Sequence, residues 1–177
     1  LVSGSGDLYY EQLLISVTSA RKHMPNANIC LLTDNKTKDS MVGYRAIALE
    51  HFNDVITVNF PGDVGNKERS RYLKTSMREK VTGDFLYIDC DTLICEDFGT
   101  PEFLDTDIGA VVDCHAYSDV YKAQAEIRKD GRRFGFKDSN KAYFNGGVLW
   151  AKDSSLTHEF FKKWHALYSE MCENGIT

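Results

Sequence analysis

The sequence predicts a single α/β domain with a mostly parallel central sheet and helices on both faces. Strand-like and helix-like patterns alternate from one end of the 177 residues to the other, as they do in such domains. No repeat, low-complexity segment or linker divides the chain, so residues 1–177 are assigned to one domain. A chain of this length can bury a sizeable hydrophobic core.

The first predicted elements lead into a buried strand. Residues 1–3 are expected to be the end of a first strand. A turn connects this strand to a helix, and Pro25 ends the helix. The apolar residues of this helix recur with a period of about 3.6 residues. They are Tyr10, Leu13, Leu14, Val17, Ala20 and Met24. Residues 28–34 have the pattern of a buried strand that ends in the polar pair Thr33 and Asp34.

The remaining elements continue the alternation. They are strands over residues 55–60, 85–88, 108–113 and 143–150, and helices over about 67–81, about 119–130 and 156–171. Pro61 ends the first of these strands, Gly83 suits the C-terminal cap of the first helix, and Gly131 ends the second helix. Five apolar residues of the last helix are expected to face the core: Leu156, Phe160, Trp164, Leu167 and Met171.

The composition excludes several classes of protein. Apolar residues make up 42% of the chain and charged residues 27%, which is the balance of a globular domain. The net charge of −5 argues against a nucleic-acid partner, and no apolar stretch approaches the roughly 20 residues of a membrane helix. Five cysteines without a C-x-x-C pair favour a reduced, cytoplasmic location, which includes the periphery of a membrane.

The most informative motif is the acidic pair Asp89 and Asp91, which follows the apolar run 85–88. Side chains alternate along an extended segment, so the two carboxylates are expected to project to the same side. Two like charges this close repel unless a divalent cation neutralises them. At the end of a buried strand such a cation would clamp a diphosphate, which indicates chemistry on a nucleotide. A strand end that is merely acidic and solvated is the alternative.

Basic residues precede this motif. Arg71, Lys74 and Arg78 are spaced by three and four residues, which places them along one face of the predicted helix. Cations beside a metal-holding pair suit a diphosphate, because the metal and the cations bind different phosphate oxygens. A solvated basic face is the alternative for each of the three, and Arg69 and Lys67 are expected to be solvated.

A second motif, Asn145-Gly146-Gly147, interrupts an apolar strand. Glycines inside a strand mark a bulge or a close approach of the backbone to a ligand. The Asn145 side chain would there hydrogen-bond sugar hydroxyls, and a bulge needed only for packing is the alternative. The motif serves a binding site only if the fold brings it to Asp89 and Asp91.

Taken in order, the two motifs resemble those of the nucleotide-sugar transferases of the Rossmann-like GT-A fold. In that family a hydrophobic strand ends in D-x-D, as in residues 85–94, and a later strand reads F-N-[GA]-G followed by a hydrophobic residue, as in residues 143–150. The likeness is greatest to the group of glycogenin, the lipopolysaccharide galactosyltransferases and related nucleotide-sugar transferases. The Thr33-Asp34 turn and the basic helix also occur in matching order, so the resemblance spans nearly the whole chain.

The resemblance implies a divalent-metal-dependent glycosyltransferase. The donor would be a nucleoside-diphosphate sugar, most often a UDP-sugar, and the acceptor a hydroxyl of a carbohydrate or glycoconjugate. Asp91 would ligate Mn²⁺ or Mg²⁺ directly, and Asp89 would contact the ribose or sugar as well as the metal. The sugar, the base, the acceptor, the stereochemistry of transfer and the oligomeric state are left open.

The resemblance also implies the remaining residues of the donor site. Lys74 or Arg71 would lie near the phosphates or the sugar of the donor. Asn145, Gly146 and Gly147 would line the sugar pocket, and Ser3 would approach the nucleotide base. The usual third metal ligand of the family is a histidine in a C-terminal segment, and His115 does not take that role. The domain is therefore expected to be incomplete at both ends, with that ligand and the catalytic residue beyond residue 177.

Two other interpretations remain open. Haloacid-dehalogenase-like phosphatases use the motif D-x-D-G-T-L, but this chain reads Asp89-Cys90-Asp91-Thr92-Leu93 and lacks the glycine. Their motif also closes the first strand, whereas at least two strands are predicted before this one. The other interpretation is a nucleotide-sugar-binding domain that does not catalyse transfer. Metal-dependent release of nucleoside diphosphate from a nucleotide sugar separates an enzyme from a binding domain.

Overall fold

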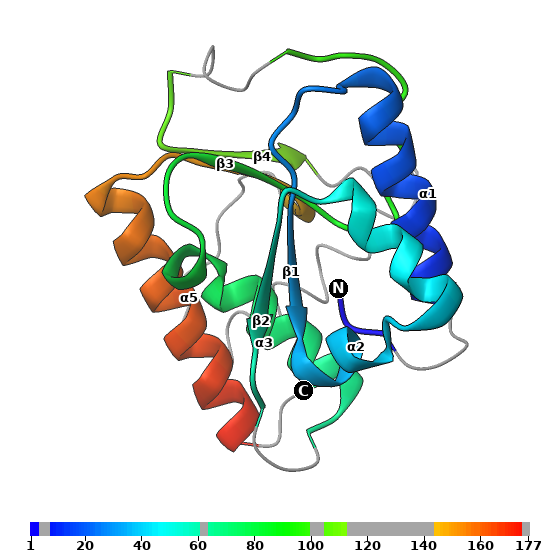
Figure 1. The fold of residues 1–177 in the computed structure, drawn as a ribbon. Coiled ribbons are helices and arrows are strands. Elements are labelled where there is room, and N and C mark those ends of the chain that lie inside the picture. The colour runs from blue at the N-terminus through cyan, green and yellow to red at the C-terminus, as the bar shows by residue number, and fades with distance from the viewer. Residues whose placement is uncertain (4–7, 61–63, 100–104, 113–143, 175–177) are drawn as a thin grey trace, which may run out of the picture.

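A computed structural model describes residues 1–3, 8–60, 64–99, 105–112 and 144–174 (Figure 1). Its elements are α1 (Leu8–His23), β1 (Cys30–Asp34), α2 (Asn35–Ser40), the 3-10 helix η1 (Gly43–His51), β2 (Asp54–Val58), α3 (Asn66–Lys80), β3 (Phe85–Ile88), β4 (Ile108–Val112), β5 (Phe144–Ala151) and α5 (Ser155–Glu173). In these ranges no helix has the length and apolar character needed to cross a membrane. The helix predicted over residues 119–130 lies outside the described residues.

The strands form two groups that differ in direction. β1 and β2 are parallel, with Cys30 opposite Asp54 and Asp34 opposite Val58. β5 lies between β3 and β4 and is antiparallel to both of them. The predicted α/β class is confirmed, and the predicted parallel direction holds for β1 and β2. An apolar run indicates that a strand is buried but does not indicate its direction. The antiparallel direction of β5 relative to β3 and β4 therefore could not be predicted from the residues of β5.

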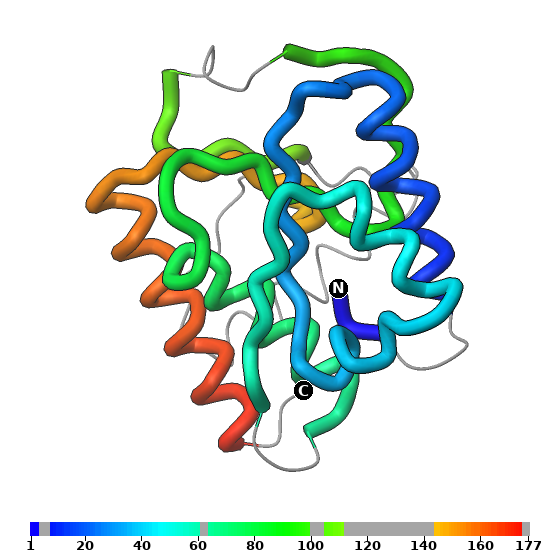
Figure 2. The backbone as a smooth tube through the Cα atoms, in the orientation of Figure 1, coloured from blue at the N-terminus to red at the C-terminus, as the bar shows by residue number. Residues whose placement is uncertain are grey.

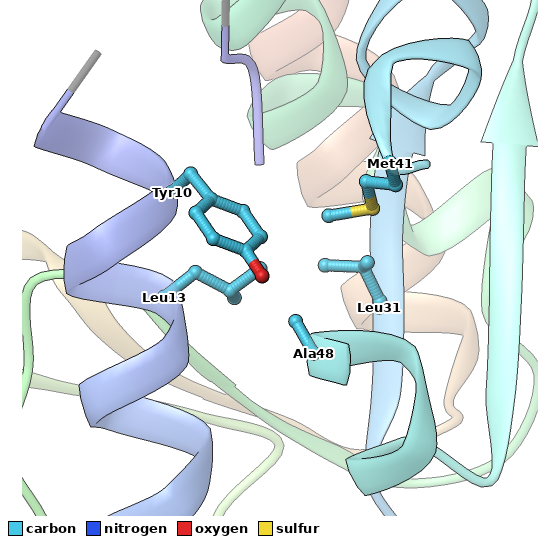
Figure 3. Packing of buried hydrophobic residues seen from close by; sticks show 5 residues of the cluster. All are labelled: Tyr10, Leu13, Leu31, Met41 and Ala48. Carbon is cyan, nitrogen blue, oxygen red and sulfur yellow. The ribbon is translucent and has the colours of Figure 1, made fainter. Parts of the chain in front are cut away.

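Helices cover both faces of the sheet, as predicted. Successive side chains of β1 point to opposite faces, and Leu31 and Leu32 accordingly pack into two different hydrophobic clusters. Leu31 joins side chains of α1, α2–η1 and η1 in the cluster of Figure 3, which comprises Tyr10, Leu13, Leu31, Met41 and Ala48. Leu32 packs against a cluster formed by α3, β5 and α5. Figure 1 shows α1 on one side of the β1–β2 pair and α5 on the other.

The buried face of α5 differs from the predicted one. Its buried residues are Thr157, Phe161 and Tyr168, and Phe161 packs against Phe85 of β3. Three of the residues predicted to be buried are instead exposed to the extent of 56% (Leu156), 41% (Phe160) and 36% (Leu167). Each lies one position before a buried residue, so two neighbouring faces of the helix are both rich in large side chains. The sequence pattern did not distinguish them, and packing on α3 and the sheet decided which face is buried.

Hydrophobic periodicity did not predict two of the elements, α2 and η1. The polar sequence of α2 follows Asp34, whose side chain accepts a hydrogen bond from the Thr37 backbone N–H and so caps the helix. An aspartate just before a helix is a recognised N-terminal signal. The polar end predicted for β1 is thus also the start of the next helix.

The chain that follows β3 returns to the other side of the molecule. Figure 2 shows the backbone after β3 passing near α1 before β4 begins. The Ile94 backbone N–H donates a hydrogen bond to Ser19 Oγ of α1 at 3.0 Å, and the Ile94 side chain is buried. These contacts fix the segment that follows Asp91 against the body of the domain.

Candidate donor site at the end of strand β3

Asp89 lies directly after β3, and both of its carboxylate oxygens accept hydrogen bonds. Lys74 Nζ is 3.0 Å from Oδ2, and the Tyr87 hydroxyl is 2.5 Å from Oδ1. The Asp89 backbone N–H donates to Gly147 O at 2.7 Å, which continues the antiparallel pairing of β3 with β5. Main chain and side chain of Asp89 are therefore both held in place.

The fold brings the Asn145-Gly146-Gly147 motif against this carboxylate. The Gly147 backbone N–H donates to Asn145 Oδ1 at 2.6 Å. A Cβ atom added to Gly147 would lie 2.8 Å from Asp89 Oδ2 and from Asn145 Oδ1, a distance that real Cβ atoms do not reach. A glycine at this position therefore lets the backbone approach the protein's own polar side chains, and the approach to a ligand stays a prediction.

The glycines also interrupt the pairing of β5 with β4. Ala110 lies opposite Leu149, but Val111 lies opposite Asn145, so the strand register shifts by several residues across Gly146 and Gly147. Such a bulge bends a strand and redirects its side chains. A bulge therefore occurs at the glycine pair, as the sequence indicated, while its service to a sugar-binding site stays a prediction.

Lys74 is the predicted cation that reaches the site. It lies in the middle of α3, where Leu73 and Met77 are buried, and its side chain is 25% exposed. Besides its ion pair with Asp89, its ammonium group lies over the ring of Tyr87, 5.2 Å from the ring centre. Packing of α3 on the sheet therefore holds Lys74 at the end of β3.

Arg71 and Arg78 occupy different surroundings, although their spacing predicted one basic stripe with Lys74. Arg71 is exposed and lies near Tyr168 of α5, where its charge opposes the rise in the Tyr168 pKa that burial causes. Arg78 is 2% exposed, donates to the Val81 and Gly83 carbonyls, and stacks on the Phe85 ring. Arg78 thus binds the backbone at the C-terminal end of α3. The three basic residues predicted to form one stripe therefore lie in three different environments.

Arg69 corrects a sequence-based prediction. It was expected to be solvated, but it is 4% exposed and forms an ion pair of 2.9 Å with the fully buried Asp34. The reason is its position in the first turns of α3, on the side that faces the end of β1. Asp34 and Arg69 are 35 residues apart, so no local pattern indicated the pair. Lys67 is exposed, as predicted.

Asp91 lies on the exposed side of a turn after β3. The turn is closed by a hydrogen bond from the Thr92 backbone N–H to Asp89 O at 3.2 Å. Burial raises the pKa of Tyr87 far above its usual value, and the negative charges of Asp89 and, to a smaller extent, Asp91 add to this rise. Tyr87 therefore remains a protonated donor to Asp89, and Asp91 is near enough to affect it.

The two carboxylates have the chemistry that a hard divalent cation requires. Mg²⁺ and Mn²⁺ prefer oxygen ligands, and Mg²⁺ usually keeps several waters beside one or two carboxylates and substrate phosphates. Within the described ranges, no three His, Cys, Asp or Glu side chains are grouped so that they could hold a metal ion. Asp89 and Asp91 stay the candidate ligands, and within the described ranges the remaining ligands of a cation would have to be water or phosphate. His115 lies outside the described residues.

Ser3 is buried at the beginning of the chain. Its backbone N–H donates to Thr37 Oγ1 at 2.9 Å, and its hydroxyl oxygen accepts from Arg45 Nη2 at 2.8 Å. The Leu1 carbonyl accepts a hydrogen bond from Thr33 Oγ1, so this segment lies beside β1, although residues 1–3 do not form the predicted strand. The contact of Ser3 with a nucleotide base stays a prediction, since residues 4–7, which follow it, are not described.

Comparisons with known proteins find a likeness of fold. No family model matches the chain, and no curated protein matches it in sequence. A solved structure that does match is the galactosyltransferase LgtC in complex with donor and acceptor sugar analogs. The match has a TM-score of 0.57 and 17% sequence identity, and it covers 93% of this chain and 63% of the galactosyltransferase chain. The described domain therefore has a fold similar to that of this galactosyltransferase, which agrees with the fold that the sequence motifs imply.

Proposed function

We propose that this protein is a glycosyltransferase that moves a sugar from a nucleoside-diphosphate sugar to an acceptor hydroxyl with the help of a divalent cation. The main support is the convergence of three distant segments at the end of β3. α3 supplies Lys74, the residue that directly follows β3 is Asp89, and β5 supplies Asn145 and the glycine pair. These are the segments that the two sequence motifs and the basic helix indicated as a donor site.

The proposed reaction exchanges one bond at the anomeric carbon of the sugar. The bond from this carbon to the diphosphate oxygen breaks, a bond to the acceptor oxygen forms, and the acceptor hydroxyl loses its proton. Negative charge develops on the departing diphosphate, and a positive group fixed beside it lowers the barrier. We assign this role to Lys74, because its ammonium group forms an ion pair with the carboxylate where the cation is proposed to bind.

A divalent cation at Asp89 and Asp91 would supply further neutralisation of the diphosphate. The protein's own part is to orient the two carboxylates. Tyr87 and Gly147 hold Asp89 through its side chain and its main chain, and the turn to Thr92 places Asp91 at the surface. The Asn145 side chain, beside the bulge, is the proposed partner of sugar hydroxyls.

The fold of the matched structure supports this assignment over a phosphatase. LgtC is a galactosyltransferase, and its structure holds donor and acceptor sugar analogs. In this chain β1 and β2 both precede the acidic motif, whereas the motif of dehalogenase-like phosphatases closes the first strand. A glycosyltransferase with a UDP-sugar donor is therefore the proposed function, and the sugar and the acceptor remain to be identified.

The test is a panel of nucleoside-diphosphate sugars, each added with and without Mn²⁺, with the melting temperature as the readout. Binding to the folded state raises stability by mass action, so the correct donor is expected to raise the melting temperature only when Mn²⁺ is present. Release of nucleoside diphosphate from that donor then distinguishes a transferase from a binding domain. Stabilisation by no member of the panel, together with hydrolysis of simple phosphate esters, would favour the phosphatase instead.

A further inference from the structure

The ion pair between Lys74 and Asp89 has a role beyond holding the two residues together. We propose that Lys74 is a built-in counter-cation that neutralises Asp89 in the resting protein and is transferred to the diphosphate of the donor when a divalent cation binds. This inference rests on the proposed function. If Lys74 exchanges Asp89 for the diphosphate, the affinity for the cation and the affinity for the nucleotide depend on each other through this one side chain.

The first argument is electrostatic. Lys74 Nζ lies 3.0 Å from Asp89 Oδ2. Because metal–oxygen distances for Mg²⁺ are about 2.1 Å, a cation on that oxygen would lie within about 5 Å of the ammonium nitrogen. Positive charges at this distance repel each other, so the ammonium group and the cation compete for the same carboxylate.

The second argument is that, of the three residues that bind Asp89, Lys74 can move away from it most easily. The other oxygen of Asp89 accepts from Tyr87, and the main chain of Asp89 is tied to Gly147. The Lys74 side chain is long and flexible and is 25% exposed. Apart from the residues next to Gly146 in the chain, Lys74 Nζ is the one atom of the described residues within 4 Å of the position that a Cβ of Gly146 would take. The absence of a side chain at Gly146 therefore leaves room beside the ammonium group.

The consequence is a coupling between two ligands. When a cation binds without nucleotide, Lys74 loses its carboxylate partner and gains none. When a diphosphate is also present, the displaced ammonium group gains phosphate oxygens as new partners. Lys74 thus weakens the binding of cation alone and strengthens the binding of both together, and by linkage the nucleotide and the cation favour each other equally.

The test measures Mn²⁺ affinity by electron paramagnetic resonance, with and without UDP, for the full chain and for Lys74→Met. Without UDP, Mn²⁺ is expected to bind the variant about two- to fivefold more tightly, the scale of a half-exposed ion pair. The factor by which UDP increases Mn²⁺ affinity is expected to fall about tenfold, because hydrogen bonds to charged phosphate oxygens are lost. Lys74→Gln serves as a second variant that keeps a hydrogen-bond donor, and melting temperatures establish that each variant is folded.

Lys163→Met is the matched control, since Lys163 forms an exposed ion pair with Glu159 on α5. It removes the same charge and should leave both Mn²⁺ affinities unchanged. If Lys74→Met binds Mn²⁺ alone no more tightly than the unmodified chain does, the counter-cation role is wrong while the proposed function stands. If neither protein binds Mn²⁺ with or without UDP, the proposed metal-dependent function and this inference both fail.

Discussion

At the scale of single residues, Asp89 and Asp91 show that two carboxylates of one motif can have different surroundings. Asp89 is held by Lys74, Tyr87 and the main chain of Gly147, whereas Asp91 is exposed on a turn. The constraints on Asp89 position it, and the exposure of Asp91 leaves it accessible to a cation in solvent. Substitutions at the site therefore separate effects on binding from effects on folding.

Asp91→Asn is expected to weaken Mn²⁺-dependent binding of a nucleoside diphosphate by about tenfold or more. Replacing a residue that only orients a metal ligand lowers the affinity for the metal by about tenfold or more. Replacing the ligand itself should lower this affinity at least as much. Because Asp91 is exposed, the free energy of unfolding should change by less than about 0.5 kcal/mol. Calorimetric titration of nucleotide with and without Mn²⁺ measures the first quantity and urea unfolding the second. Undiminished metal-dependent affinity would contradict the assignment of Asp91.

Gly147→Ala is expected to lower the free energy of unfolding by about 1–3 kcal/mol, the usual cost of overpacking. The added Cβ would lie 2.8 Å from both Asp89 Oδ2 and Asn145 Oδ1, so one of these side chains must move. Gly146→Ala is the matched control, because the nearest described atom to its added Cβ, apart from the neighbouring residues in the chain, is the flexible end of Lys74 at 3.9 Å. Urea unfolding of both variants tests this, and equal effects would show that the close approach at Gly147 is not tight.

At the scale of elements, α3 contacts both groups of strands, β1 with β2 and β3 with β5 and β4. Arg69 near its beginning pairs with Asp34 at the end of β1, Lys74 in its middle reaches β3, and Arg78 near its end binds the turn before β3. The helix also packs along α5, where Thr75 Oγ1 and His165 Nδ1 are 2.8 Å apart. The position of Lys74 at the site therefore depends on contacts made along the whole of α3.

Arg69→Ala is expected to lower the free energy of unfolding by about 3–5 kcal/mol, the cost of leaving a buried charge without its partner. Asp34 has no exposed surface and, among the side-chain partners that the structure describes, would keep the two hydrogen bonds from Thr37. Lys67→Ala, on the exposed part of the same helix, should change stability by less than about 0.5 kcal/mol. Chemical unfolding of the two variants decides the matter, and similar small effects would mean that Asp34 is solvated after all.

The contact between α3 and α5 is expected to weaken in acid. Burial lowers the pKa of His165, while the nearby Glu79 and Lys80 have smaller and opposite effects. The unfolded chain therefore binds a proton more readily than the folded one, and stability is lost as the pH falls through about 6.5. His165→Asn keeps a polar group near Thr75 but does not titrate, so it should lose less stability than the unmodified chain between about pH 7.5 and pH 5.5. Unfolding free energies at the two pH values test this, and equal losses would contradict it.

At the scale of the whole molecule, the sequence predicted the elements better than their arrangement. β3 has the predicted bounds, and α3 and β5 begin and end within one residue of the predicted positions. These elements are marked by local signals, namely continuous apolar runs and the period of a helix. The polar element α2 and the short η1 have weaker local signals and were not predicted.

By itself, the sequence determined the α/β class and singled out the two motifs, whose binding of a cation and a diphosphate stays a prediction. Only the tertiary structure decided that Lys74, rather than Arg71 or Arg78, pairs with Asp89, and that Arg69 is buried with Asp34. It also decided the direction of β5 and the buried face of α5. The physical reason is that apolar patterns and turn residues act over a few positions, whereas ion pairs and strand direction join residues far apart in the chain. Such pairings form only when the whole domain packs around them.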